Sequence, residues 1–257
     1  MPVDSPAAFA YEYHRGSNKR FEWSGVVDLF MVKNLCLTLR QAKVIPDDLN
    51  DWAGNVILDA SANNGRFTHA FIKSLVISSV SGMNPAKIEV VINDISYVIK
   101  NVSQPLEIEV DQTISEMQAN SDLSGFNFRR LDKNYLDVKS ADLSGKQGKL
   151  IIDRLGAAWH MRKWKEVEQY FEVGRELLDL GGSIIVDAFN AQKKPQGIGD
   201  NYSTYQHLAY NFVEEAETSR FNQWLFDKYG FSTNIYELSG AEIIKRDRAI
   251  CVWRRER

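Results

Sequence analysis

The stretch from Asn55 to Thr68 constrains this chain most, because it combines an apolar run, an acidic residue and a polar turn in immediate succession. Asn55–Leu58 is a short apolar run of the kind that fills a buried parallel strand. Asp59 ends that run, and Ser61–Gly65 supplies turn chemistry, since Asn and Gly tolerate the left-handed backbone of a sharp turn. The pattern predicts a strand that enters a tight turn directly.

A helix should begin near Gly65, because apolar residues then recur at helical spacing at Phe67, Phe71 and Leu75. A strand that leads through a tight turn into a helix brings backbone N–H groups and the positive helix end to the carboxyl edge of a sheet. Open α/β sheets bind their ligands at this edge. The stretch therefore predicts a ligand site in an α/β fold, although a turn that binds no ligand, or another nucleotide, would have a similar pattern.

The rest of the chain alternates strand and helix patterns, which predicts an α/β, doubly wound, mostly parallel Rossmann-like sheet with helices on both faces. The other expected strands are residues 88–92, 126–131, 150–153, 183–186, 231–238 and 248–253. The other expected helices are a buried one that ends near residue 41, one over 98–120 broken at Pro105, one from residue 164 that Gly181-Gly182 stops, and one over 207–229. Residues 1–54 should form an N-terminal extension and a helix packed on a core of residues 55–257.

Composition narrows the class of protein. The chain has 257 residues, 44% hydrophobic and 25% charged, which suits one large globular domain. The net charge of −3 gives no basic footprint for nucleic acid, so a large RNA substrate is disfavoured but not excluded. Cys36 and Cys251 fit no metal spacing and are expected to be reduced packing residues of a cytoplasmic protein. No metal site, membrane span or signal peptide is expected.

The first motif resembles that of a known family. Asp59, Gly65 and Phe67 follow a buried strand with the spacing Asp-x-x-x-x-x-Gly-x-Phe, which is similar to the first motif of class I S-adenosylmethionine (SAM)-dependent methyltransferases. The nearest variant is that of ribose 2′-O-methyltransferases, Asp-x-Gly-Ala-x-Pro-Gly-x-Phe, with Ser61 in place of the first glycine and Asn64 in place of the proline. A dinucleotide-binding fold is less expected, because Gly-x-Gly-x-x-Gly is absent.

This resemblance implies a SAM site. It also implies that the last two strands close the sheet as an antiparallel hairpin. Asp94 should accept hydrogen bonds from the ribose, since an ionised carboxylate is acceptor-only, and Gly65 should lie where the cofactor approaches the backbone closely. Asp132 should accept from the adenine amine, with Asp137 as the competing candidate. The implied cofactor-binding residues are Asp59, Ala60, Ser61, Asn63, Gly65, Phe67, Asp94, Ile95, Asp132 and Asp153.

The acceptor side should lie at the ends of the fourth and fifth strands, since in the resembled family the end of the fourth strand lies beside the sulfonium and the substrate. The candidate catalytic residues are Asp153, His160 and Asp187, and the candidate substrate-binding residues are Trp159, Asn190 and Tyr202. A histidine can act as a base near neutral pH, but Trp159 and His160 also fit a helix opening with a packing role. The long loop from Lys193 to Tyr205 is a candidate lid.

The catalytic set of ribose 2′-O-methyltransferases is not present. Asp153 can match the Asp of their Lys-Asp-Lys-Glu tetrad, but Asp187 stands where the second Lys should fall, and Arg248 or Ala249 stands near the place of the Glu. A carboxylate cannot stabilise a developing alkoxide as a lysine does. The sequence therefore predicts a SAM-dependent methyltransferase with a small-molecule acceptor. The alternatives are an RNA methyltransferase with an atypical catalytic set and an inactive SAM-fold binding or regulatory protein.

Overall fold

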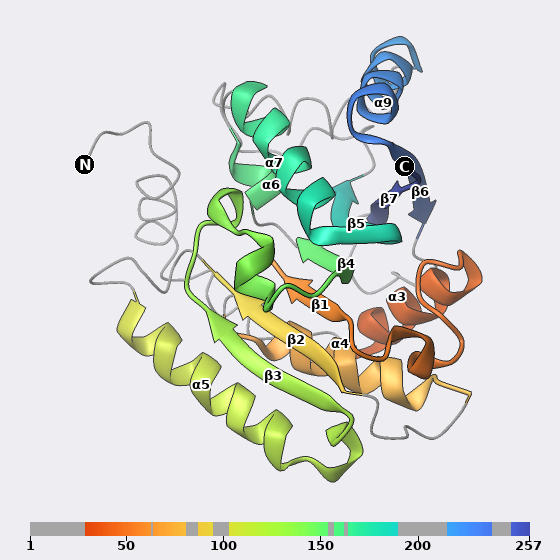
Figure 1. Cartoon of the computed structure of the whole chain (residues 1–257). Helices are drawn as coiled ribbons and strands as arrows, with labels where there is room; N and C mark the ends of the chain where they lie inside the picture. Colours follow the sequence, from red (N-terminus) through yellow and green to blue (C-terminus); the bar gives the residue numbers. More distant parts are fainter. Residues whose placement is uncertain are drawn as a thin grey trace.

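The structure, a computed structural model, describes residues 29–62, 64–80, 87–94, 103–153, 157–161, 164–189, 215–237 and 248–257. Its centre is a seven-stranded sheet in the order β3-β2-β1-β4-β5-β7-β6 (Figure 1). The strands are β1 Val56–Asp59, β2 Ile88–Asn93, β3 Phe126–Leu131, β4 Gly148–Asp153, β5 Leu178–Phe189, β6 Phe231–Glu237 and β7 Arg248–Arg255.

The sheet is parallel from β3 to β5 and antiparallel at its other end. β1 pairs with β2 on one side and with β4 on the other, all in parallel, and β7 runs antiparallel between β5 and β6. The chain builds outward from β1 to β3 and then returns to place β4 against the other side of β1. The strand order therefore reverses between β1 and β4, and ligands of open α/β sheets bind outside the carboxyl ends of the strands at such a switch point.

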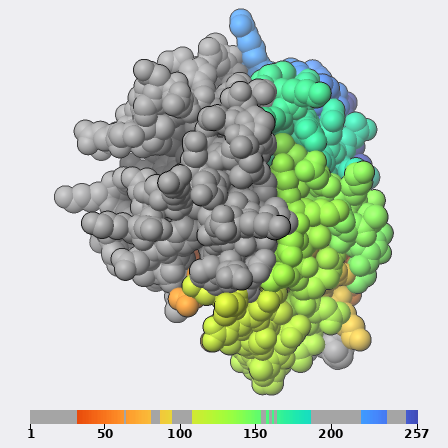
Figure 2. All heavy atoms as spheres, turned by 90° about the vertical axis from the view of Figure 1, so that its left-hand side faces the viewer, coloured from red at the N-terminus to blue at the C-terminus, as the bar shows by residue number. Residues whose placement is uncertain are grey.

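Helices cover both faces of the sheet. One face carries α3 Leu29–Gln41, α4 Arg66–Ile77 and α5 Ser103–Ala119, and the other carries α6 Ala157–His160, α7 Trp164–Leu177 and α9 Glu215–Tyr229 (Figure 1). Short 3₁₀ turns lie at Leu49–Trp52, Ser121–Leu123, Tyr135–Asp137 and Ser140–Leu143. α5 packs against β3, and the yellow-green surface of α5 is seen from the side in Figure 2.

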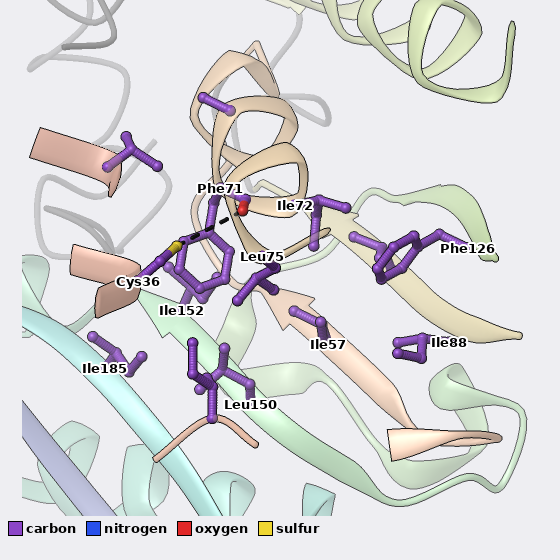
Figure 3. Packing of buried hydrophobic residues seen from close by; sticks show 14 of the residues in the cluster. Cys36, Ile57, Phe71, Ile72, Leu75, Ile88, Phe126, Leu150, Ile152 and Ile185 are labelled. Atoms are coloured by element: carbon purple, nitrogen blue, oxygen red, sulfur yellow. Dashed lines mark hydrogen bonds between the residues drawn. The ribbon is translucent and has the colours of Figure 1, made fainter. Parts of the chain in front are cut away.

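The strands supply two separate cores because successive side chains point to opposite faces. Val56 and Leu58 of β1 belong to the core under α7 and α9, whereas Ile57 between them belongs to the core under α3, α4 and α5. Figure 3 shows the second core, in which the Cys36 thiol points at the backbone oxygen of Phe71, 3.9 Å away. All four residues of β1 are buried, as expected for a central parallel strand.

The structure confirms the predicted fold class, including the parallel sheet, the C-terminal antiparallel hairpin and helices on both faces. The predicted N-terminal helix is present as α3 and packs on α4, although the proposed boundary at residue 54 stays a prediction. No helix in the described ranges is both long and apolar enough to cross a membrane.

Two local expectations were wrong. Pro105 does not break α5 but lies in its first turn, where the missing N–H has no intrahelical partner to lose. Gly181-Gly182 does not stop α7, which ends at Leu177; the pair lies inside β5, where the pairing with β4 is irregular. A Cβ on Gly182 would come within 2.9 Å of the Asp179 carbonyl oxygen, so close backbone approach explains this glycine.

Candidate functional site

The predicted ligand turn lies at the carboxyl ends of β1, β2 and β4. Gly65 caps α4 with a left-handed backbone, φ 76°, which favours glycine, and its N–H bonds the Ala62 carbonyl at 2.8 Å. Asn64 is buried; its Oδ1 accepts from the Arg66 N–H and its Nδ2 donates to Glu109 of α5. The turn is therefore fixed both to the start of α4 and to α5.

The side of Gly65 where a side chain would lie faces α5. A Cβ at Gly65 would point at α5 and meet Cγ2 of Thr113 at 3.4 Å and Cγ2 of Val110 at 3.5 Å. The positive φ therefore favours glycine here, and the Cβ side of Gly65 faces α5. The approach of a cofactor to the Gly65 backbone stays a prediction. Phe67 likewise packs on the core, with its ring stacked on Phe71 at 5.9 Å between centroids.

Asp59 ends β1 as a buried carboxylate. Its Oδ1 accepts from the Ser61 backbone N–H at 3.2 Å, and its Oδ2 accepts from the Thr68 hydroxyl of α4. Burial raises the pKa of Asp59 to about 7, the two hydrogen bonds oppose this rise, and the nearby charges of Asp94 and Asp153 add to it. A positive charge placed near Asp59 would favour the ionised carboxylate.

Asp153 ends β4 with no exposed surface, and several hydrogen-bond donors surround it. Its Oδ1 accepts from the Ser61 hydroxyl at 2.9 Å, and its Oδ2 accepts from the Ala158 N–H at 2.7 Å and from the Tyr170 hydroxyl at 3.0 Å. Burial raises the pKa of Asp153, against these hydrogen bonds. With three donors on a buried carboxylate, Asp153 holds the turn after β1, α6 and α7 together, and its predicted catalytic and cofactor-binding roles stay predictions.

The end of β2 holds two polar residues of different character. Asn93 is fully buried: its Nδ2 donates to the Ala60 carbonyl at 3.3 Å, its Oδ1 accepts from the Lys133 N–H at 3.0 Å, and its own carbonyl accepts from the Ala62 N–H. Asn93 thus joins the turn after β1 to the chain after β3. Asp94 follows directly and is buried. Its carboxylate lies close enough to Asp59 to raise the pKa of Asp59.

The two adenine candidates have different settings. Asp132 pairs with Arg130, whose Nε lies 2.8 Å from Oδ1 and whose Nη2 lies 3.2 Å from Oδ2, and Arg130 also bonds Asp111 of α5. The hydrogen bond from Arg130 falls on Oδ2, and Oδ1 has no hydrogen-bond partner among the described residues, so an adenine amine could bond Oδ1 beside this ion pair. Asp137 ends a 3₁₀ turn and is exposed. Both remain predictions.

The structure describes only part of the predicted acceptor side. Trp159 and His160 lie in α6, and Asp187 lies within β5, opposite Ile250 of β7 rather than at the strand's end; their side chains are outside what the structure describes. Asn63, Ile95, Asn190, Tyr202 and the loop from Lys193 to Tyr205 lie outside the described residues. In the part of the chain that the structure describes, no three His, Cys, Asp or Glu side chains are grouped as metal ligands would be.

Sequence reasoning missed two residues that organise this edge. Asn93 stood next to the chosen Asp94, and a polar residue as the last member of an apolar strand was the available signal. In the sequence, Tyr170 fits the apolar face of an amphipathic helix. Only the tertiary structure brings its hydroxyl to Asp153, 17 residues earlier in the chain.

Comparisons with known proteins agree on the fold. No protein-family model and no curated protein sequence matches this chain. Its structure is similar to the methyltransferase domain of bacterial CtHen1, with 11% identity, a TM-score of 0.51, and 88% of this chain and 98% of that one covered. It is also similar to the Burkholderia thailandensis 1,6-didemethyltoxoflavin-N1-methyltransferase with bound S-adenosylhomocysteine, with 12% identity, a TM-score of 0.51, and 100% and 93% covered.

A third similar structure is the mitomycin 7-O-methyltransferase, with 10% identity, a TM-score of 0.53, and 95% of this chain and 60% of that one covered. All three are methyltransferases, and their likeness to this chain lies in the fold. The chain therefore has the fold of class I SAM-dependent methyltransferases, and its polar turn lies where that fold has its sheet's switch point.

Proposed function

We propose that this chain is a SAM-dependent methyltransferase. The observation that carries the proposal is the pair of buried carboxylates, Asp59 and Asp94, at the carboxyl ends of the neighbouring strands β1 and β2. They flank the turn that leads into α4, beside the point where the strand order reverses. A buried carboxylate is costly unless a partner compensates for its charge, and such pairs concentrate at binding sites.

The residues of this turn fit SAM chemically. SAM carries a positive sulfonium and a positive amino group, and the raised pKa of Asp59 marks a carboxylate that would gain from a nearby cation. We propose that Asp94 accepts from the ribose hydroxyls and that the backbone of residues 60–65 adjoins the methionine part, with Asn63 and Ile95 as further proposed contacts. Asn93 bonds both Ala60 and Ala62, so the backbone of this turn is anchored to β2, and a bound ligand would restrict it further.

The protein's contribution to such a reaction is mainly positional. SAM supplies an activated methyl group, so the chain must hold donor and acceptor in line and exclude water. Asp153 serves this through its hydrogen bonds to Ser61, Ala158 and Tyr170, which hold the turn after β1, α6 and α7 together. We retain His160 and Asp187 as proposed catalytic residues, and Trp159, Asn190 and Tyr202 as proposed acceptor contacts.

We propose a small molecule as the acceptor. The net charge is −3, and the described edge of the sheet carries the carboxyl groups of Asp59 and Asp94, which would disfavour the phosphates of an RNA. The named substrates of two similar structures, 1,6-didemethyltoxoflavin and mitomycin, are small molecules too. An RNA acceptor would need a basic surface contributed by other parts of the chain.

A second candidate function is SAM binding without transfer. The observation that favours it is the state of Asp153, whose carboxylate oxygens are occupied by three internal donors and have no exposed surface. A protein built this way could bind SAM and serve as a regulatory or structural subunit.

Calorimetry with SAM and S-adenosylhomocysteine tests the shared first step, and a co-crystal structure then tests the placement. Binding of both ligands, with the ribose on Asp94, supports the proposal. If neither ligand binds, both the methyltransferase function and the SAM-binding function are contradicted. Incubation with methyl-labelled SAM and a panel of small molecules and RNAs separates the alternatives. Label transfer to a small molecule supports an enzyme of the proposed class, sequence-dependent label on RNA contradicts the acceptor, and binding without transfer to any acceptor favours the second function.

A further inference from the structure

Ser61 occupies a position between two buried carboxylates that lie on opposite faces of the sheet. Its backbone N–H donates to Asp59, which is also bonded to Thr68 of α4. Its hydroxyl donates to Asp153, which is also bonded to Tyr170 of α7. One residue of the turn after β1 is therefore joined to both helical layers.

The same hydroxyl also holds the start of α6. The Ala157 N–H donates to Ser61 Oγ at 3.1 Å, and the next N–H, that of Ala158, donates to Asp153 Oδ2 at 2.7 Å. α6 has only four residues, Ala157–His160, too few to be stable as an isolated helix. Its position thus depends on Ser61, on Asp153 and on the packing of Ala158, which is fully buried.

We infer that Ser61 is a positioning residue that couples occupancy of the turn after β1 to the placement of α6, so that the methyl donor prepares the acceptor side. This inference rests on the proposed function. A ligand that binds the turn restricts it, and a turn that is already restricted holds the Ser61 hydroxyl in place for Ala157. Trp159 and His160 follow on the same short helix, so the backbone that carries these two proposed site residues would be placed by the bound donor.

The inference depends on the hydroxyl that serine provides at position 61. A glycine at position 61, which the resembled motif would have, could bond Asp59 through its N–H but would offer nothing to Asp153 or to Ala157. Only the serine hydroxyl, which donates one hydrogen bond and accepts another, completes the connection to β4 and α6.

Amide hydrogen exchange, followed residue by residue in the full chain with and without S-adenosylhomocysteine, tests this coupling. In the wild-type protein, the ligand should slow exchange at Ala157 and Ala158 about tenfold. In Ser61→Ala, both amides should exchange about tenfold faster without ligand, and ligand at a saturating concentration should slow them by less than about twofold. Ser61→Thr, which keeps the hydroxyl, should restore both behaviours.

Ser115→Ala is the matched control, because the Ser115 hydroxyl bonds only its own helix, at the Asp111 carbonyl on the exposed side of α5. It should leave exchange in α6 unchanged. If Ser61→Ala does not fold, Ser61→Gly removes the same hydroxyl and takes its place.

Two results would overturn the inference alone: ligand binding that protects α6 equally in the wild type and in Ser61→Ala, or a Ser61→Thr protein that behaves like Ser61→Ala. If the wild-type protein does not bind S-adenosylhomocysteine in calorimetry, the proposed function fails and the coupling fails with it. The binding measurement therefore distinguishes the two failures.

Discussion

At the scale of single residues, Asp59 and Asp153 carry most of the chemistry at the end of the sheet. Both are buried, both have a raised pKa, and each is bonded to a different helical layer, Asp59 through Thr68 of α4 and Asp153 through Tyr170 of α7. Asp153 has three donors and Asp59 has two, so Asp59 has more capacity for a ligand or water. The two carboxylates therefore differ in role although the sequence presents them alike.

Asp59→Asn should stabilise the free protein at high pH. The folded pKa, about 7, lies above the ordinary value of 3.8, so Asp59 favours folding most at low pH and that contribution is lost as pH rises from 3.8 to 7. The loss is about 1.4 kcal/mol per pH unit in this window, as an upper limit. Urea unfolding at pH 5 and pH 8 measures this loss. The free energy of unfolding of Asp59→Asn, relative to the wild type, should be higher at pH 8 than at pH 5. An equal difference at both pH values contradicts the prediction.

Asp94→Ala should weaken SAM binding, because a paired acceptor for the ribose hydroxyls would be lost, at a cost of about 1.5–3 kcal/mol. That loss raises the dissociation constant tenfold or more, as measured by calorimetry. Asp51→Ala, at an exposed aspartate in the 3₁₀ turn before β1, is the control and should bind SAM as the wild type does. An unchanged affinity in folded Asp94→Ala would exclude this placement of the ribose.

At the scale of elements, the turn between β1 and α4 is defined by its neighbours as much as by its own sequence. Asn93 of β2 holds Ala60 and Ala62, Glu109 of α5 holds Asn64, and α5 lies against Gly65. α4 is held at its other end by Arg40 of α3, whose Nη2 donates to the Leu75 carbonyl at 3.0 Å. Charged donors near the last carbonyls of a helix stabilise that end.

Gly65→Ala and Gly54→Ala should cost similar stability, about 1–2 kcal/mol each, because both glycines have a left-handed backbone and both added methyl groups find room. Substitution by valine, which is larger than alanine, should distinguish the two positions. Gly65→Val should lose more stability than Gly54→Val, because Thr113 and Val110 lie beside Gly65 and nothing lies within 4 Å of the Gly54 site. Urea unfolding of the four variants tests this, and equal losses for both valines would contradict the placement of α5.

At the scale of the whole molecule, one sheet separates two cores. Cys36 lies in the core under α3 and α4, and Cys251 of β7 lies in the core under α7 and α9. Both thiols are buried, and burial raises the pKa of Cys36 to about 12 and raises that of Cys251 as well. Each thiol therefore reports on one face of the sheet.

Neither thiol should react with a thiol reagent in the native state at pH 8, because both are buried and protonated, and the thiolate is the nucleophile. If the two cores unfold as one unit, Cys36→Ala and Cys251→Ala proteins should be labelled at the same rate on addition of urea. Full labelling in concentrated guanidinium chloride is the control. Faster labelling at Cys36 than at Cys251 would show that α3 opens separately from the rest of the fold.

The sequence alone determined the class of fold and the place of the polar turn between β1 and α4. Both depend on local patterns: apolar runs at strand spacing, apolar residues at helical spacing, and polar residues where a strand ends. It therefore located β1, α4 and the acidic residues Asp59, Asp94 and Asp153 correctly at strand ends. It failed at Pro105 and at Gly181-Gly182, where proline and glycine fit either a break or a continued element, and only the surrounding backbone distinguishes them.

Only the tertiary structure decided what the polar residues do. The bond between Ser61 and Asp153 joins residues 92 positions apart, and that between Asn93 and Lys133 joins residues 40 apart. The hydrogen bonding of a buried carboxylate depends on which strands lie next to each other and on which face each side chain points to, and a sequence pattern records neither across such distances. The sequence thus determined that carboxylates end these strands, and the packing of β1 against β4, α6 and α7 made Asp153 an internal anchor.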